Sequence, residues 1–353
     1  MSYKIKCINC KNNENKNIIT CGLCLNSLET KVINKIKIHN SNRSIFLRYR
    51  CFFSINNKQF LKKYPNNPTP VIKLHEKNIY AKLEYCSFSS SSKDREAFIE
   101  IAMARKLGYK GIAAASTGNM GAALASLCAM FKFPCFVFIP IDTSETKVKQ
   151  IKQFGATVKK VAGNYDYIVP LVMKFAQNNN FFLASLQAFR FEGYKTIAYE
   201  IFETFGKNLP KNITIPLGDG TTYVGVWKGF NDLKTAGLIN MIPSLIGVQA
   251  KQCAPIVDAY KNKSDIKVVN NPKTLAKAIR IGNPLDGEYS LRVAKITKGQ
   301  MLSYKEEEII KSQATLLKQG VNAEYASALT YCPVMFNNLN NCLLLITGFG
   351  FKN

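Results

Sequence analysis

Residues 111–140 read GIAAASTGNMGAALASLCAMFKFPCFVFIP, and their pattern predicts the fold class. A short apolar run of strand type, GIAAAS, enters the turn STGNMG, which opens a helix of small residues, AALASLCAMF. A second apolar run, FPCFVFIP, is typical of a buried strand. Strand and helix alternate here, so the stretch predicts an α/β fold with a mostly parallel sheet.

The alternation continues on both sides of this stretch. Upstream, residues 94–107 have apolar side chains at helical spacing and end at Gly108, as a helix C-cap would. Downstream, residues 145–155 predict a helix and residues 157–163 a strand. The second half repeats the pattern, with helices expected at 194–206, 220–237 and 305–320 and strands at 212–218, 244–250 and 341–350. Two α/β units with a ligand cleft between them fit this order best.

Composition indicates an ordinary folded protein. The 353 residues are 47% hydrophobic and 20% charged, far from the composition of a disordered chain. A net charge of +25 normally favours an anionic partner, but the lysines are spread among asparagines and isoleucines along the whole chain. A nucleic-acid partner is therefore not expected, although the densest basic stretch, from Lys31 to Arg50 with Lys62 and Lys63, leaves a phosphate-binding surface as an alternative.

The chain is expected to be soluble, reduced and cytoplasmic. Its start, MSYKIKCINCKNN, lacks the apolar core of a signal peptide, and its longest apolar runs are far shorter than the roughly 20 residues of a membrane helix. Eleven cysteines without a secretory context indicate free thiols rather than disulfides.

Four of the cysteines form a pattern of their own. Cys7, Cys10, Cys21 and Cys24 make two CxxC pairs with polar, turn-forming sequence between them, the layout of a zinc ribbon. Four thiolates can close a tetrahedral structural zinc site. The alternative is four free cysteines in a degenerate appendage.

Three turns rich in glycine or serine each open a predicted helix, namely SSSSKDRE, ASTGNMGAA and PLGDGTTYVG. In the last turn, residues 218–222 offer consecutive backbone N–H groups, two hydroxyls and a helix N-terminus, which together suit a phosphate. Taken alone, this turn could equally be an ordinary α/β connection.

The order of motifs is more specific. From about residue 65 to the C-terminus, KLE, SKDR, ASTGNMGAA, EGYKTIAYEI, PLGDGTT, GVQA, IGNP, AEYASA and ITGFGFK follow one another, and the chain resembles the threonine synthases among fold-type-II pyridoxal-phosphate (PLP) enzymes. The resemblance implies a tryptophan synthase beta-like fold with two parallel-sheet α/β domains. It implies a small domain at 93–185, a large PLP-binding domain at 46–92 and 186–353, and a zinc-ribbon-like segment with a basic linker at 1–45.

The resemblance also implies roles for the residues that match the family motifs. Lys93 matches the lysine that holds PLP as a Schiff base, and Asn119 the asparagine that binds the phenolic oxygen of the cofactor. Thr347 matches the threonine at the pyridine nitrogen. The loop for the cofactor phosphate is matched by Gly218, Asp219, Gly220, Thr221 and Thr222.

Four further residues match substrate-binding positions. Ser116 and Thr117 match the turn that receives the substrate carboxylate, and Ser185 and Arg190 match positions that bind the phosphate of O-phospho-L-homoserine. The alternative for Arg190 is a surface arginine at a strand end. The chain departs from the family at other positions, where it has Ser90 and Ser92 before the lysine, Met120, Tyr325 in EYASA, and Phe349 in TGFG.

The expected function is therefore that of a threonine synthase, a PLP-dependent carbon–oxygen lyase that converts O-phospho-L-homoserine and water to L-threonine and phosphate. The resemblance implies a homodimer. One alternative is another fold-type-II PLP lyase, such as a serine or threonine dehydratase or a cysteate-synthase-like enzyme. A second is a zinc-ribbon nucleic-acid-binding protein, which would leave the long α/β body unexplained.

Overall fold

The structure is a computed structural model that describes residues 2–15, 20–24, 26–33, 38, 44–65, 67–116, 118–163 and 165–352. The chain divides into two compact units. Unit 1 comprises Met1–Pro68 and Lys93–Glu200, and unit 2 comprises Thr69–Ser92 and Ile201–Asn353. The domains expected from the family resemblance are a separate division, with boundaries after residues 45, 92 and 185. The two divisions share the boundary after residue 92.

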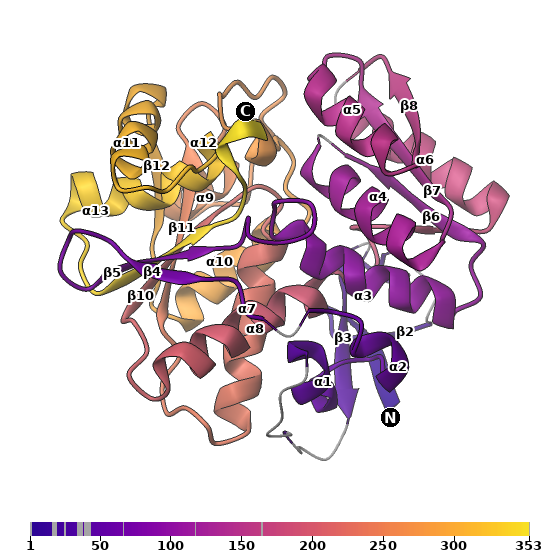
Figure 1. Ribbon diagram of the computed structural model, residues 1–353, viewed down its shortest axis with the longest axis horizontal. Coiled ribbons are helices and arrows are strands. Elements are labelled where there is room, and N and C mark those ends of the chain that lie inside the picture. Colours follow the sequence, from indigo (N-terminus) through magenta and orange to yellow (C-terminus); the bar gives the residue numbers. More distant parts are fainter. Residues whose placement is uncertain are drawn as a thin grey trace. The chain divides into compact units, whose positions relative to one another are not determined.

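A four-stranded parallel sheet forms the body of unit 1, in the order β8-β7-β6-β9 (Figure 1). The stretch quoted first supplies β6 (Gly111–Ala115), α4 (Asn119–Phe131) and β7 (Cys135–Pro140), which confirms the α/β prediction. The remaining elements of the body are α3 (Lys93–Lys106), α5 (Glu145–Gln153), β8 (Thr157–Val161), α6 (Tyr165–Asn179), β9 (Phe181–Leu183) and the first part of α7 (Arg190–Phe205).

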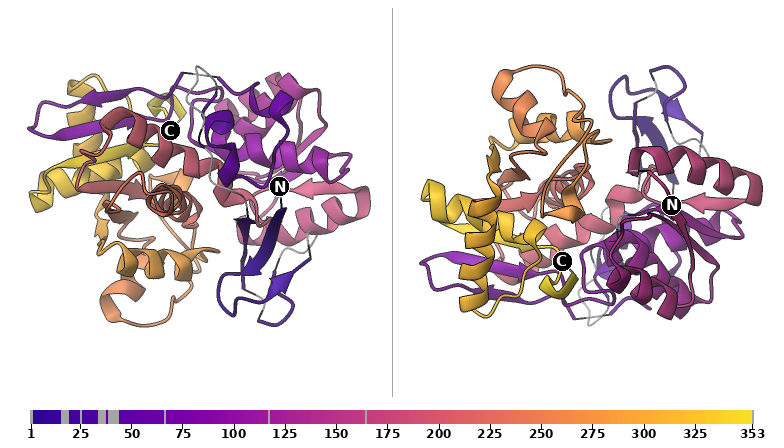
Figure 2. Two further views of the ribbon diagram at one scale, coloured as in Figure 1. Left: turned by 90° about the horizontal axis from the view of Figure 1, so that it is seen from below. Right: turned by 90° about the horizontal axis from the view of Figure 1, so that it is seen from above.

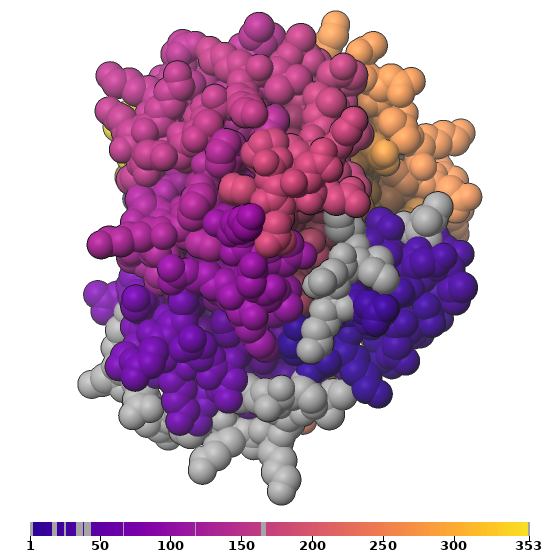
Figure 3. All heavy atoms as spheres, turned by 90° about the vertical axis from the view of Figure 1, so that its right-hand side faces the viewer, coloured from indigo at the N-terminus to yellow at the C-terminus, as the bar shows by residue number. Residues whose placement is uncertain are grey.

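The N-terminal part of unit 1 is a small antiparallel sheet in the order β2-β1-β3, drawn as indigo arrows in Figure 2. Atoms of this part of the chain are the indigo spheres in Figure 3. It consists of β1 (Ser2–Cys7), β2 (Asn13–Glu14) and β3 (Leu28–Ile33). Short helical turns follow at α1 (Ile45–Arg48), η1 (Arg50–Phe52) and α2 (Lys58–Leu61). Glu192 of α7 is fully buried and accepts hydrogen bonds from Thr30 of β3 and from the backbone N–H and hydroxyl of Ser54, so the small sheet is held directly on α7.

Unit 2 contains a six-stranded sheet in the order β12-β11-β10-β13-β5-β4, parallel except for the edge strand β4. Its strands are β4 (Val71–Lys73), β5 (Ile79–Leu83), β10 (Asn212–Pro216), β11 (Ser244–Ala250), β12 (Met301–Tyr304) and β13 (Cys342–Ile346). Its helices are α8 (Thr221–Thr235), α9 (Pro255–Asn262), α10 (Gly287–Ile296), α11 (Glu306–Lys318), α12 (Tyr325–Ala328) and α13 (Cys332–Asn337), with short turns η2 (Lys277–Ile279), η3 (Leu329–Tyr331) and η4 (Gly350–Lys352).

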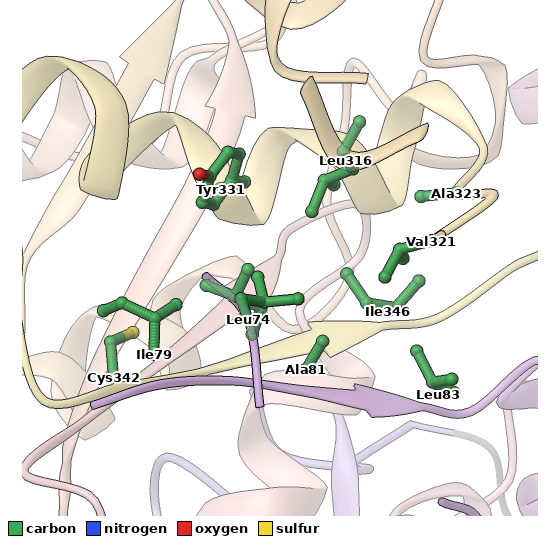
Figure 4. Packing of buried hydrophobic residues seen from close by; sticks show 12 residues of the cluster. Leu74, Ile79, Ala81, Leu83, Leu316, Val321, Ala323, Tyr331, Cys342 and Ile346 are labelled. Atoms are coloured by element: carbon green, nitrogen blue, oxygen red, sulfur yellow. The ribbon is translucent and has the colours of Figure 1, made fainter. Parts of the chain in front are cut away.

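One face of this sheet is covered by an apolar cluster, shown in Figure 4. Ile79 and Ala81 from β5 and Ile346 from β13 lie beneath Leu316 of α11 and Tyr331 of η3. Burial of such side chains contributes about 25 cal/mol for each square ångström of apolar surface removed from water. The cluster therefore stabilises β5 and β13, and Thr347 follows directly after β13. Among the helices in the described ranges, none has both the length and the hydropathy of a membrane span.

Candidate functional site

Lys93 is the first residue of α3, in unit 1. Its side chain is 32% exposed, whereas Glu96 beside it is 1% exposed, and the Lys93 Nζ lies 3.5 Å from the Glu96 Oε2. The Nζ also lies 5.4 Å from the centre of the Tyr194 ring, which belongs to α7. The amine is thus accessible on one side and held by a buried acid and an aromatic ring on the other.

The turn before α4 places two of the predicted residues close together. Ser116 is buried, and its Oγ accepts hydrogen bonds from the Gly118 N–H at 3.0 Å and the Gly121 N–H at 2.8 Å. Asn119 is the half-buried first residue of α4. Thr117 lies outside the described residues. The Ser116 hydroxyl therefore caps the N-terminus of α4, where the carboxylate of the substrate is expected.

The predicted phosphate-binding pair lies in the connection from β9 to α7. Ser185 has a φ of 65°, and its N–H donates to both carboxylate oxygens of Glu100, at 2.9 and 3.1 Å. Arg190 is fully buried, and its Nη1 donates to the Leu28 and Gln187 carbonyls, both at 3.0 Å. The alternative of a surface arginine is therefore wrong. The guanidinium also supports the small N-terminal sheet, because Leu28 begins β3.

Glu100 is a fully buried acid next to this pair. Burial and the nearby Glu96 carboxylate hold the pKa of Glu100 well above its ordinary value, while the Ser185 N–H lowers it. Two carboxylates in such a small volume favour a state in which they do not both carry charge.

In unit 2, the glycine loop opens α8 as predicted. Gly220 has a φ of 93°, and a Cβ added there would lie 2.3 Å from the Ser290 Oγ and 2.9 Å from the Asp286 carbonyl oxygen. The Thr221 hydroxyl donates to the Asp286 carboxylate at 2.9 Å, and the Asp219 carbonyl accepts the Asp286 N–H at 2.9 Å. The close packing requires glycine, and it leaves an N-terminus of a 15-residue helix beneath the loop.

Thr347 follows β13, also in unit 2. Its hydroxyl lies 3.0 Å from the hydroxyl of Ser327, which in turn accepts the Gly348 N–H at 2.9 Å. The Thr347 carbonyl accepts the Ser92 N–H at 2.8 Å. The hydroxyl of Thr347 thus has a fixed partner that positions it, and Ser327 was not singled out by the sequence.

The four N-terminal cysteines form one cluster. The Sγ atoms of Cys7, Cys10, Cys21 and Cys24 all lie within 4.8 Å of one another. In each CxxC pair a backbone N–H two residues after the first cysteine donates to its sulfur, from Asn9 to Cys7 at 3.3 Å and from Leu23 to Cys21 at 3.4 Å. Hydrogen bonds from the Asn26 backbone and from Cys7 lower the pKa of the Cys24 thiol to about 6. A zinc–sulfur distance of about 2.3 Å places tetrahedral sulfurs about 3.8 Å apart, so this donor set fits zinc.

The structure describes the surroundings of three residues at which the chain departs from the family pattern. Ser90 stands where the family usually has glycine and has a φ of 59°, in the left-handed region that glycine occupies most easily. The ring of Phe349 packs against the ring of Tyr85, with 5.1 Å between the ring centres. Met120 is buried in α4.

The predicted residues are divided between the two units. Lys93, Ser116, Asn119, Ser185 and Arg190 belong to unit 1, and the 218–222 loop and Thr347 belong to unit 2. Sequence reasoning missed Glu96, Glu100 and Tyr194. Lys93, Glu96 and Glu100 lie on one face of a helix by their spacing, which the sequence could have revealed, whereas nothing local marks Tyr194 as their partner.

Comparison with known proteins places this chain among relatives. Residues 63–344 match the family described as pyridoxal-phosphate dependent enzyme. A threonine synthase of Methanocaldococcus jannaschii is 35% identical over 256 residues, 71% of this chain and 63% of that protein. One from Methanosarcina acetivorans is 35% identical over 260 residues, 72% of this chain and 64% of that protein, so the chain spans slightly less than two thirds of either. A threonine synthase of Bacillus sp. (strain ULM1) is 30% identical over 328 residues, which cover 88% of this chain and 90% of that protein.

Solved structures share the fold. Maize serine racemase superposes with a TM-score of 0.68 at 16% identity, over 80% of this chain and 88% of that one. A fungal L-serine ammonia-lyase from Rhizomucor miehei gives a TM-score of 0.69 at 17% identity, over 80% and 94% of the two chains. With its parallel α/β sheets and a family match over most of its length, this chain belongs to the pyridoxal-phosphate dependent enzymes of fold type II.

Proposed function

We propose that this protein is a threonine synthase, which converts O-phospho-L-homoserine and water to L-threonine and phosphate. The observation that carries the proposal is the likeness to relatives of that name, at 30–35% identity, one of which is covered over 90% of its length. The order of the motifs from SKDR to TGFG supports the same assignment.

The residues present fit PLP as the cofactor. An accessible amine suits its aldehyde, and a tight glycine loop at a helix N-terminus suits its phosphate. We assign the covalent attachment to Lys93, the phenolic oxygen to Asn119 and the pyridine nitrogen to Thr347, whose hydroxyl is oriented by Ser327. The cofactor phosphate is assigned to the loop at 218–222.

The proposed reaction moves protons and exchanges one carbon–oxygen bond for another. Bound PLP supplies an electron sink for charge that develops on the substrate carbons. Lys93 removes one proton from Cα and one from Cβ, and a proton is returned to Cα after the carbon–oxygen bonds have been exchanged. The bond from Cγ to the phosphate oxygen breaks, Cγ gains a proton, and the oxygen of water bonds to Cβ.

Substrate binding is proposed at Ser116 and Thr117 for the carboxylate and at Ser185 and Arg190 for the leaving phosphate. A guanidinium suits a phosphate dianion because its N–H groups form a planar fork. In the structure the Nη1 of Arg190 donates to two carbonyls of its own unit, so the side chain is already held in a single orientation.

The burial of Arg190 also favours a second candidate, a serine or threonine dehydratase. If Arg190 only binds groups of its own unit, the pair Ser185 and Arg190 offers no cation to the phosphate of a substrate. The two functions differ in their products, because a dehydratase releases ammonia and a keto acid from a substrate without phosphate.

The deciding experiment supplies the PLP-loaded protein with O-phospho-L-homoserine and measures phosphate and threonine. A parallel reaction supplies serine or threonine and measures ammonia. Threonine and phosphate formed in equal amounts are the expected result. Ammonia from threonine without any phosphate release from O-phospho-L-homoserine would refute the proposal and favour the dehydratase.

Arg190→Ala refines this test. Loss of a hydrogen bond to a charged group costs about 1.5 to 3 kcal/mol, so kcat/KM for O-phospho-L-homoserine should fall roughly 10- to 100-fold. Arg105→Ala, which removes an exposed arginine from α3, is the matched control and should leave kcat/KM unchanged. Equal kcat/KM in the Arg190 variant and the wild type would remove Arg190 from the substrate site.

We also propose that Cys7, Cys10, Cys21 and Cys24 hold one structural zinc ion. Four sulfur ligands leave no open position for water, so the ion is given no part in the reaction. Its role is to hold the small N-terminal sheet in shape, and that sheet contacts α7 through Thr30 and Leu28.

A further inference from the structure

One face of α3 carries a row of charged side chains. Lys93, Glu96 and Glu100 occupy positions i, i+3 and i+7 of the helix, so their side chains lie above one another. The two acids are buried, at 1% and 0% exposure, whereas the lysine is accessible. Buried acids are rare in proteins unless they are paired, so this row requires an explanation.

Glu96 is the acid that contacts Lys93. Its Oε2 lies 3.5 Å from the Lys93 Nζ and accepts a hydrogen bond from the Tyr194 hydroxyl at 2.7 Å. Its Oε1 is buried and has no hydrogen-bond partner among the residues that the structure describes. Tyr194 thus contacts both groups, with its hydroxyl on the acid and its ring beneath the ammonium.

The other charged groups nearby have different partners. Arg95 donates to Glu200 at 2.8 and 2.7 Å, and the Nη1 of Arg190 donates to two backbone carbonyls. Asp94 is buried on the next position of α3, and Glu100 accepts the Ser185 N–H. Within the described part of the chain, the Lys93 ammonium is therefore the cation at ion-pair distance from Glu96.

The position of Lys93 at the start of α3 favours acids in the first turn of that helix. The N-terminus of a helix carries a partial positive charge, which disfavours a cation and favours an anion in the first turn. An ammonium at the first position of α3 is thus in an unfavourable field unless a carboxylate offsets it. Asp94 and Glu96 both lie in that first turn, and Glu96 is the acid recorded at ion-pair distance from Lys93.

We propose that Glu96 is a positioning residue for Lys93, which holds the amine of Lys93 as an ammonium against the Tyr194 ring whenever that amine is not joined to the cofactor. The inference rests on the proposed role of Lys93 as the cofactor lysine. It assigns the return of the Lys93 amine to one fixed place to a side chain three residues further along the same helix.

The test measures the reactivity of Lys93 in the protein without PLP. Lysines are acetylated with trace acetic anhydride at neutral pH, and the peptide that contains Lys93 is quantified by mass spectrometry. An amine held in an ion pair reacts more slowly than a free one. Because a partly exposed ion pair is weak, Glu96→Gln should raise the labelling rate of Lys93 about two- to fivefold.

Glu100→Gln is the matched control, because it replaces a buried acid on the same face one turn further away, whose pKa burial already holds well above its ordinary value. This change should leave the labelling rate of Lys93 nearly unchanged. The inference is overturned if Glu96→Gln leaves the labelling rate of Lys93 unchanged, or if Glu100→Gln raises it as far as Glu96→Gln does.

Folding is followed in the same samples. Lys195 and Lys82 are 3% and 0% exposed and bind the Phe52 and Thr69 carbonyls, so they label only if their units open. If Glu96→Gln makes Lys195 reactive, the inference is tested instead by the melting temperature of the Lys93→Met variant with and without Glu96→Gln. Lys93→Met leaves Glu96 buried without its cation, and the added Glu96→Gln change should then raise the melting temperature. A further fall in the double variant would contradict the inference.

These outcomes are separable from those of the proposed function. The labelling uses neither cofactor nor substrate, so a faster labelling of Lys93 in the Glu96→Gln variant supports the Glu96 inference whatever reaction the loaded enzyme performs. Absence of covalent PLP from the wild-type protein would instead contradict the role assigned to Lys93.

Discussion

Arg95, two residues after Lys93, offers the sharpest test of how the site is supported. Its side chain is 1% exposed, and its guanidinium donates to the two carboxylate oxygens of Glu200 at 2.8 and 2.7 Å and to the Thr196 hydroxyl at 2.8 Å. The pair joins α3 to α7 where their backbones meet, since a Cβ added at Gly193 would lie 2.0 Å from the Arg95 carbonyl oxygen. This contact places Tyr194 beside Glu96.

Removal of one partner from this pair should be costly. Arg95→Met removes the guanidinium that donates two hydrogen bonds to the buried Glu200 carboxylate, and removal of one partner of a buried ion pair typically costs about 3 to 5 kcal/mol. The matched control is Glu145→Gln, which breaks the Lys160–Glu145 pair, whose side chains are 36% and 81% exposed. Exposed pairs are typically worth about 0 to 1 kcal/mol. The double change Arg95→Met with Glu200→Leu removes both charges and should recover much of the loss.

Urea unfolding followed by circular dichroism measures the free energy of unfolding of each variant. We expect Arg95→Met to lower it several times more than Glu145→Gln does, and the double variant to lie above Arg95→Met. The reasoning is refuted if Arg95→Met costs no more than the exposed control, or if the double variant is less stable than the single one.

Four other features of the chain each give a prediction. Lys93→Ala should abolish the visible absorbance of covalently attached PLP, and borohydride reduction that still fixes cofactor to this variant would contradict the assignment. The protein should contain one zinc ion per chain. The Cys21→Ser variant should lose this ion and show faster amide exchange in the first thirty or so residues, while its cofactor absorbance stays at the wild-type level. Protein that contains no zinc after production in zinc-rich medium would contradict this prediction. Ser90→Gly should raise the melting temperature, because a left-handed conformation costs an L-residue about 1 to 2 kcal/mol, only part of which is offset by the freer unfolded chain. Burial raises the pKa of Glu100 above its ordinary value of 4.5, so the unfolded chain releases this proton at a lower pH than the folded chain does. The free energy of unfolding should therefore fall as the pH rises from 4.5 through the raised pKa of the folded state. The Glu100→Gln variant should show a smaller fall when the free energy of unfolding is measured over a pH series.

Much of the fold could be predicted from the sequence because its signals are local. The period of apolar residues in 94–107 and the glycine at 108 predict a helix, and the structure has α3 at Lys93–Lys106. The glycine turn at 218–222 predicts the start of α8, because only glycine has the backbone freedom for that close packing. The spacing of two CxxC pairs predicts a cluster of four sulfurs, since each pair forms a tight turn of the chain.

The burial and the long-range hydrogen bonds of the functional residues depend on the tertiary structure. Glu192 accepts hydrogen bonds from Thr30 and Ser54, which lie 162 and 138 residues away in the chain, so no local pattern marks it as the support of the small sheet. The sequence does not distinguish a surface arginine from a buried one at position 190, yet Arg190 is fully buried and donates to the Leu28 carbonyl of β3. Local propensity selects helices, strands and turns, and helical spacing places Glu96 beside Lys93. Burial depends on which elements pack together, and that packing buries Glu96 and brings the Tyr194 ring of α7 to the Lys93 amine.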